Sequence, residues 1–177
     1  MIFLSANQRQ YTPQLDSMFH GVRALWVDGQ DEDIIFHGAV GYDCTVEIKR
    51  IGQDFVRSIL NGHLATQLSR AKDNGRNVLM LATYGELDHD PQSGMARTRT
   101  FSKGGRSAMV VLEPNVMYQT LLRRLYTVLI KQGVMWVQGQ HLKGMCDQLT
   151  EWYWWWQAPP EDHISNQQPY QYAYLSS

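Results

Sequence analysis

Apolar and polar residues follow two different periods along the chain, one typical of strands and the other of helices. Residues 44–49 alternate between the two types, and residues 78–82 are apolar throughout, as in a strand that is buried on both faces. Residues 54–73 and 115–132 repeat apolar side chains every three or four positions, which predicts amphipathic helices. Strands that alternate with helices predict an α/β domain in which helices flank a mixed central sheet.

Shorter elements complete this prediction. We expect an early hairpin or meander of strands, and a final helix–strand–helix unit that covers one face of the sheet. Asn61-Gly62 interrupts the first long helix, Asn74-Gly75 ends it, and Gly133 ends the second. The remaining expected strands are 2–4, 23–27, 34–36, 95–101, 108–112 and 134–137, and the remaining expected helices are 12–19 and 140–156.

Length and composition are those of one ordinary globular domain. The chain has 177 residues, of which 44% are hydrophobic and 19% charged, so residues 1–156 can form one core. Residues 157–177 are rich in Gln, Asn, Pro, Ser and Tyr. We expect this tail to be flexible or draped over the surface, because it has little apolar area to bury.

Charge and cysteine content narrow the function further. A formal net charge of −1 is not that of a general nucleic-acid binder, so any DNA contact must come from local basic patches. Two cysteines form neither a disulfide framework nor a zinc cluster, and they suit a reducing, cytoplasmic interior. No stretch of the sequence approaches a membrane span, so we expect no membrane partner.

The triplet Glu47-Ile48-Lys49 carries the strongest candidate chemistry. Side chains alternate across a strand, so Glu47 and Lys49 point to the same face. The carboxylate can bind a hard cation such as Mg²⁺, and the ammonium can orient an attacking water or neutralise charge on a phosphate. These are the parts of a metal-dependent phosphodiesterase, although a surface strand often carries Glu and Lys only as a solvated pair.

The residues that follow the triplet strengthen the nuclease interpretation. In order and type they resemble the XPF-type family of structure-selective endonucleases, a branch of the PD-(D/E)-x-K superfamily, and compact phage-encoded members are the most similar in size. The resemblance covers most of residues 1–156 and implies a restriction-endonuclease-like α/β fold. The matching positions are Glu47, Lys49, Asp54-Phe55, Ser58-Ile59, Gly62, Leu64, Gln67, residues 78–81 and Trp136.

The resemblance implies a site made of two acids, a lysine and a main-chain carbonyl. Asp33 best matches the metal-binding aspartate of the family. Asp33 and Glu47 would hold Mg²⁺, or Mn²⁺ in its place, together with the backbone carbonyl of Ile48, and Lys49 would position or activate the water. Asp43 is the reserve metal ligand, because it lies four positions before Glu47 and an even spacing places both on one face.

The chain also departs from the family pattern. Ile48 and His63 stand where the family has arginines, residues 6–9 lack the first-strand acid, and Ala82 replaces a glutamate. These losses motivate a second hypothesis, a catalytically impaired protein with the nuclease fold that binds DNA or serves as an adaptor subunit. A restriction-type or RNA-directed nuclease of the wider superfamily is a third.

Basic and polar residues after the triplet are candidate DNA contacts. Several follow the site strand, and others lie in a predicted glycine-bearing loop that has no acid between Met95 and Ser107. A solvated basic surface is the alternative. The candidate DNA-binding residues are Arg50, Arg57, His63, Gln67, Arg70, Arg97, Arg99, Lys103 and Arg106.

Partner contacts are expected because many relatives grip DNA with a tandem helix-hairpin-helix domain, for which this chain has no room. The resemblance implies a homodimer, so substrate grip would come from the basic loop, a second subunit or a partner protein. Residues 152–156 contain too many tryptophans for one helical stripe. We expect these rings to cover the sheet, to bind the tail tyrosines or to form a dimer contact, with stacking on unpaired bases as a further alternative.

Overall fold

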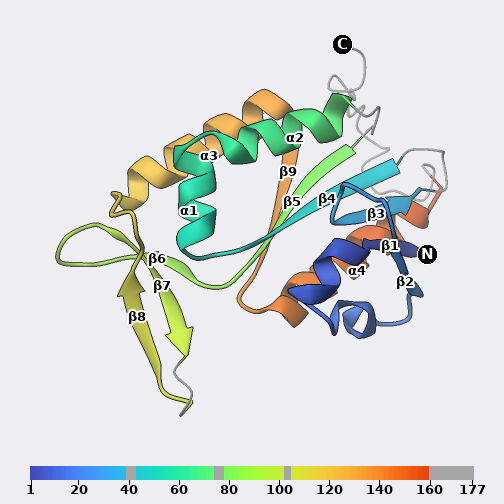
Figure 1. The fold of residues 1–177 in the computed structure, drawn as a ribbon, viewed down its shortest axis with the longest axis horizontal. Helices are drawn as coiled ribbons and strands as arrows, with labels where there is room; N and C mark the ends of the chain where they lie inside the picture. The colour runs from blue at the N-terminus through green and yellow to red at the C-terminus, as the bar shows by residue number, and fades with distance from the viewer. Residues whose placement is uncertain (39–42, 74–77, 102–104, 160–177) are drawn as a thin grey trace.

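The computed structural model describes residues 1–38, 43–73, 78–101 and 105–159, and this part of the chain forms a large sheet, a small sheet and flanking helices (Figure 1). The strands are β1 (Ile2–Ser5), β2 (Ala24–Val27), β3 (Ile34–His37), β4 (Asp43–Arg50), β5 (Val78–Tyr84), β6 (Leu87–His89), β7 (Ala96–Phe101), β8 (Ser107–Val111) and β9 (Val134–Gly139). The helices are the short 3-10 turns η1 (Ala6–Gln10) and η2 (Leu15–Met18), and α1 (Gln53–Leu60), α2 (His63–Asp73), α3 (Tyr118–Gln132) and α4 (Leu142–Gln157).

The large sheet is mixed, with the strand order β2-β1-β3-β4-β5-β9. β3 pairs antiparallel with β1 and with β4, whereas the pairs β1–β2, β4–β5 and β5–β9 are parallel. Every described strand of this sheet except β3 therefore points the same way, and the carboxyl ends of these strands meet at one edge. Ligands of α/β sheets bind at this kind of edge.

Two cores form because side chains alternate across the central strands. Ile48 of β4 and Met80 of β5 pack with α4 on one face of the sheet. Leu81 packs with α1, α2 and α3 on the other face. Figure 1 shows this division, with α1, α2 and α3 on one side of β4 and β5 and α4 on the other. The apolar run at residues 78–82 is therefore a strand buried on both faces, as predicted.

The last two helices lie on opposite faces, so the expectation that the helix–strand–helix ending covers one face is wrong. Leu125 of α3 belongs to the core with α1 and α2, whereas Met145 of α4 belongs to the other core. Because α1 to α3 already fill the first face, the apolar stripe of α4 is buried against the second. Gly139 permits the tight turn into α4, since a Cβ there would lie 2.2 Å from the backbone nitrogen of Met145.

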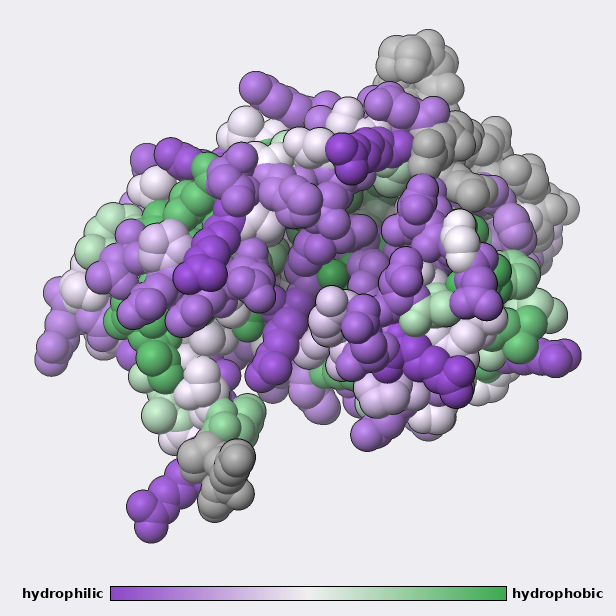
Figure 2. Space-filling model, in the orientation of Figure 1, coloured by the Kyte–Doolittle hydropathy of each residue, from purple (hydrophilic) through white to green (hydrophobic). Residues whose placement is uncertain are grey.

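The small sheet is antiparallel, with the order β6-β7-β8. Its hairpin β7–β8 projects from the body at the lower left of Figure 1. Hydrophobic and hydrophilic residues are mixed on this projecting part in Figure 2, in keeping with the exposure of Phe101, Val110 and Val111. The expected strands at 95–101 and 108–112 are thus present, but they form a hairpin in a sheet of their own.

Helix boundaries differ from the prediction in two places. The helix expected at residues 54–73 is two helices, because Gly62 adopts a left-handed conformation with φ +79° between them. The helix expected at 12–19 is reduced to the 3-10 turn η2. The predicted stop at Asn74-Gly75 and the tail from residue 160 lie outside the described residues. Within the described part of the chain, no helix combines the length and apolar character needed to cross a bilayer.

Candidate active site

Glu47 and Lys49 lie side by side at the carboxyl end of β4. The Nζ atom of Lys49 donates to Oε1 of Glu47 at 2.5 Å. Only 22% of the Lys49 side chain and 15% of the Glu47 side chain are exposed. Ile48 between them packs into the α4 core, so the pair shares the opposite face of the sheet. The pair is therefore partly buried, unlike the solvated surface pair that was the alternative.

Asp33 lies directly across from Glu47. The register of β3 against β4 pairs Ile34 with Val46, and one further step places Asp33 opposite Glu47, with both side chains on one face. Asp33 is 7% exposed, and its Oδ2 atom accepts the backbone N–H of Ile48 at 2.7 Å. The structure thus brings this acid to the carboxylate–ammonium pair, as the resemblance implied.

The protonation of Asp33 reflects this crowding. Burial, followed by the negative charge of Glu47, raises the pKa of Asp33 to about 6. Hydrogen bonds from the Ile48 N–H and the Gln8 amide, and the positive charge of Lys49, act in the opposite direction. A buried carboxylate whose ionisation is opposed by a neighbouring carboxylate favours a cation between the two.

Gln8 also contacts Asp33, although its region lacks the acid of the family pattern. It lies in η1, which follows β1 at the carboxyl edge of the sheet. Its Nε2 atom donates to Oδ1 of Asp33. Gln8 was not among the site residues predicted from the sequence. One feature of the sequence could have indicated it. Gln8 lies in the segment where the family has a carboxylate, and its amide also has an oxygen that can bind a cation.

The donor chemistry of the site fits a hard cation. Asp33 and Glu47 supply carboxylate oxygens, and the carbonyl of Ile48 points to the same side of β4 as its N–H, which faces Asp33. Mg²⁺ and Mn²⁺ prefer oxygen ligands of these types. Among the described residues, no group of three or more His, Cys, Asp or Glu side chains could hold a metal. A cation here would therefore depend on two acids and on neutral oxygens.

Asp43 is not brought to this site. It shares a face of β4 with Glu47, but four residues of a strand span about 13 Å. Its carboxylate contacts Nδ1 of His37 across the β3–β4 pair. The structure therefore places the reserve candidate at the opposite end of the strand.

Ala82, where the family often has a glutamate, faces away from the site. It is registered with Ile48 and packs in the α4 core, so a carboxylate at this position would be buried among apolar side chains. The residue registered with Lys49 is Thr83, whose hydroxyl accepts the Trp136 Nε1–H at 3.0 Å. The absence of an acid at position 82 therefore removes no side chain from the face of the sheet that carries Glu47 and Lys49.

Two arginines of the predicted basic loop are paired with acids. Arg97 lies on β7 and donates to Asp88 of β6 at 2.7 Å. Arg99, also on β7, donates to Glu86 at 2.6 Å. At these two positions the predicted loop is a strand, and the small sheet brings the acids of residues 86–90 beside the arginines.

The other candidate DNA contacts are spread over several elements. Arg50, His63, Arg70 and Arg106 are exposed. Arg57 is exposed and lies 3.8 Å from the carboxylate of Asp54. The amide oxygen of Gln67 is buried without a hydrogen-bond partner among the described residues. Lys103 lies outside the described residues.

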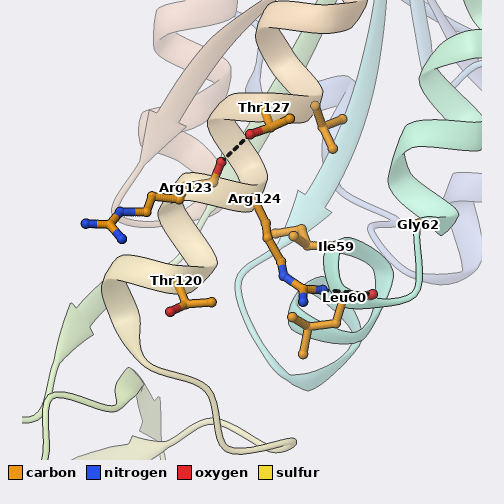
Figure 3. A pocket seen from close by; sticks show the side chains of 8 residues that line it. Ile59, Leu60, Gly62, Thr120, Arg123, Arg124 and Thr127 are labelled. Atoms are coloured by element: carbon orange, nitrogen blue, oxygen red, sulfur yellow. Dashed lines mark hydrogen bonds between the residues drawn. The ribbon is translucent and has the colours of Figure 1, made fainter.

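A groove of about 410 Å³ between the α1–α2 turn and α3 was not indicated by the sequence analysis (Figure 3). Arg124 points into this groove and donates to the carbonyl of Leu60 at 3.3 Å. Arg123 points away from it. None of the described lining residues is acidic, so the groove is positively charged. In the sequence, the two consecutive arginines on a predicted helix were the feature that could have indicated this groove.

The architecture is the restriction-endonuclease-like α/β fold that the sequence resemblance implied. Among solved structures, the chain is similar to XPF from Aeropyrum pernix, with a TM-score of 0.61 and 13% identity, over 92% of this chain and 64% of that one. It is also similar to XPF from Aeropyrum pernix in complex with DNA, with a TM-score of 0.57 and 15% identity, over 86% of this chain and 62% of that one.

At this low sequence identity, the similarity to these structures shows a shared fold. The expected XPF-like fold is confirmed over nearly the whole chain. The chain spans less than two thirds of the length of either similar structure. No protein-family model matches the sequence, and no curated protein matches it.

Proposed function

We propose that this chain is a Mg²⁺-dependent DNA endonuclease that cuts branched, flapped or junction DNA. The observation that carries the proposal is the meeting of Asp33, Glu47 and Lys49 at the carboxyl edge of an XPF-like sheet. The substrate class rests on the family resemblance. It is supported by the similarity to XPF from Aeropyrum pernix in its complex with DNA.

The residues of the site have distinct roles in this proposal. Asp33, Glu47 and the carbonyl of Ile48 would hold Mg²⁺, for which Mn²⁺ can substitute. When bound, the cation would supply Lewis acidity toward a phosphate oxygen and would lower the pKa of a water. Lys49, which contacts Glu47, would donate a hydrogen bond to the attacking water or to the phosphate. Its positive charge offsets the charge that develops during phosphodiester hydrolysis.

Substrate contacts would extend outward from the end of β4. Arg50 is exposed and directly follows Lys49, so it is the basic candidate that is nearest in sequence to the site. Arg106, which directly precedes β8, and the groove beside α3 are additional positive features. Because the net charge of the chain is −1, such local charges have to supply the attraction for phosphate.

A second subunit or a partner protein would complete the substrate grip. Trp154 and Trp155 near the end of α4 are 50% and 36% exposed. Large aromatic side chains at this exposure are common at protein interfaces. We therefore infer a homodimer or a heteromeric contact that includes this end of α4, and light scattering on the purified protein measures the oligomeric state.

Cleavage assays with purified protein test the proposed function. Flap, fork, four-way and linear DNAs are incubated with Mg²⁺ or Mn²⁺, and the products are separated on denaturing gels. We expect cuts in branched substrates that disappear with EDTA and with Glu47→Gln. Intact DNA for every substrate, combined with measurable binding, would instead support the catalytically impaired DNA-binding or adaptor subunit.

A further inference from the structure

Gln8 is the described side chain of η1 that reaches the acids of the site. Its Nε2 atom donates to Oδ1 of Asp33, and both lie at the carboxyl edge of the large sheet. Its neighbours are engaged elsewhere. The Ser5 hydroxyl donates to the carbonyl of Gln30 at 2.9 Å, and the Arg9 guanidinium lies 5.9 Å from the centre of the Trp26 ring.

The backbone of Gln8 is firmly held. Its carbonyl accepts the N–H of Tyr11 at 3.0 Å, the N–H of Thr12 at 2.9 Å and the hydroxyl of Thr12 at 3.1 Å. The strand before η1 is tied to the Asp33 segment through the Ser5 N–H, which donates to the Asp33 carbonyl at 3.0 Å. The side chain of Gln8 is thus presented to Asp33 from a fixed main chain, as is expected of a built ligand position.

The amide of Gln8 can serve either of two states of the site. Its NH₂ group donates to a carboxylate, and rotation of the amide by half a turn presents the carbonyl oxygen instead. Adjacent oxygens around an octahedral Mg²⁺ lie about 2.9 Å apart, which is also hydrogen-bond distance. An oxygen in place of the donating nitrogen would therefore suit a cation that is bound to Asp33.

We propose that Gln8 is a neutral third ligand side chain, whose amide oxygen joins Asp33 and Glu47 on a divalent cation and whose amide nitrogen holds Asp33 when the cation is absent. This inference rests on the proposed metal-dependent function. It explains how a site with two acids gains a further oxygen without a third negative charge. It also predicts weaker cation binding than an acid at position 8 would give, because ligand charge raises affinity for hard cations.

Cation binding by Gln8 variants tests the inference without measuring cleavage. Mn²⁺ binding to the full chain is followed by calorimetry and by the EPR signal of free Mn²⁺. Gln8→Glu is expected to tighten the Kd about tenfold, and Gln8→Leu to weaken it about tenfold. Gln10 lies exposed in the same 3-10 helix, so Gln10→Glu and Gln10→Leu are matched controls that should stay within about twofold of the unmodified chain.

The outcomes separate this inference from the proposed function. Mn²⁺ binding that requires Glu47 but is no tighter in Gln8→Glu than in Gln10→Glu would overturn the role of Gln8 and leave the proposed function standing. If Gln8→Glu does not fold, equal affinities for Gln8→Leu and Gln10→Leu have the same meaning. A chain that binds no Mn²⁺ at all would overturn both.

Discussion

The carboxylate of Asp33 accepts the backbone N–H of Ile48 at 2.7 Å, although 15 positions separate the two residues. Ile48 lies between Glu47 and Lys49, so one bond fixes an acid from the start of β3 against the strand that carries the other acid. The bond also satisfies a strand N–H at a point that lies before the start of β3, where that strand offers no backbone partner. Strand pairing thereby assembles the candidate site.

The first prediction concerns the carboxylate and the ammonium on β4. Glu47→Gln and Lys49→Met should each lower the cleavage rate at least 100-fold, roughly the contribution of a positioned catalytic group. Asp43→Asn is the matched control, because Asp43 lies on the same strand and face but about 13 Å away. Its rate should stay within about threefold of the unmodified chain. An equal loss in Asp43→Asn would contradict the placement of the site.

The second prediction concerns the effect of pH on stability without divalent cations. Native Asp33 keeps its proton up to about pH 6, whereas the unfolded chain loses it near pH 4. The native state therefore binds more protons between these values, and the free energy of unfolding should fall as pH rises, by on the order of 3 kcal/mol.

Urea titrations at several pH values measure this dependence. Asp33→Asn removes the titrating group and should flatten the curve between pH 4 and pH 6. Asp54→Asn is the control, because the Asp54 side chain is fully exposed. A slope that survives in Asp33→Asn would show that another group is responsible.

The third prediction concerns cation binding to the folded chain. A cation and a proton compete for Asp33, so Mg²⁺ should raise the melting temperature more at pH 7.5 than at pH 5. Differential scanning fluorimetry with and without about 10 mM Mg²⁺ measures the difference, and excess ligand is needed for a shift. The shift should vanish in Glu47→Gln, and an equal shift in that variant would place the cation elsewhere.

The fourth prediction separates two classes of arginine. Arg50 is exposed at the end of β4, whereas Arg99 is held by Glu86 at 2.6 Å. Arg50→Ala should weaken binding of a branched DNA severalfold and reduce the slope of log affinity against log salt by about one. Arg99→Ala should change the affinity less than about twofold. Fluorescence anisotropy at several salt concentrations compares them, and a larger effect of Arg99 would reverse this assignment.

The fifth prediction tests the packing behind the site. The fully buried Thr83 accepts the indole N–H of Trp136 at 3.0 Å. Thr83→Val keeps the volume but leaves that donor without its partner, so the free energy of unfolding should fall by about 1–2 kcal/mol. Chemical denaturation measures the change. Thr127→Val is the control, because the Thr127 hydroxyl is exposed and bonds within its own helix.

Local periodicity was enough to predict much of the fold. Strand alternation placed Glu47 and Lys49 on one face, and the continuous apolar run at 78–82 identified the strand buried on both sides. The order of the residues after the triplet indicated the XPF-like fold, which the structural similarity confirms. These properties depend on neighbours in sequence, so the sequence by itself determined them.

Long-range pairing decided the rest. Whether Asp33 or Asp43 joins Glu47 depends on the register of β3 against β4, and the contact of Gln8 with Asp33 depends on the edge at which β1 ends. The pairing of Arg99 with Glu86 likewise requires the small sheet to fold back on itself.

Such contacts join residues that are far apart in the sequence, and the local periodicity of the sequence does not predict them. The sequence also does not predict which face of the sheet α3 and α4 cover, because either face can bury an apolar helix. In the structure α3 packs with α1 and α2 on one face, and α4 packs on the other. The sequence therefore determined which side chains could form a metal site. The tertiary structure decided which of them meet, because hydrogen-bond register and the competition for buried surface are properties of the assembled sheet.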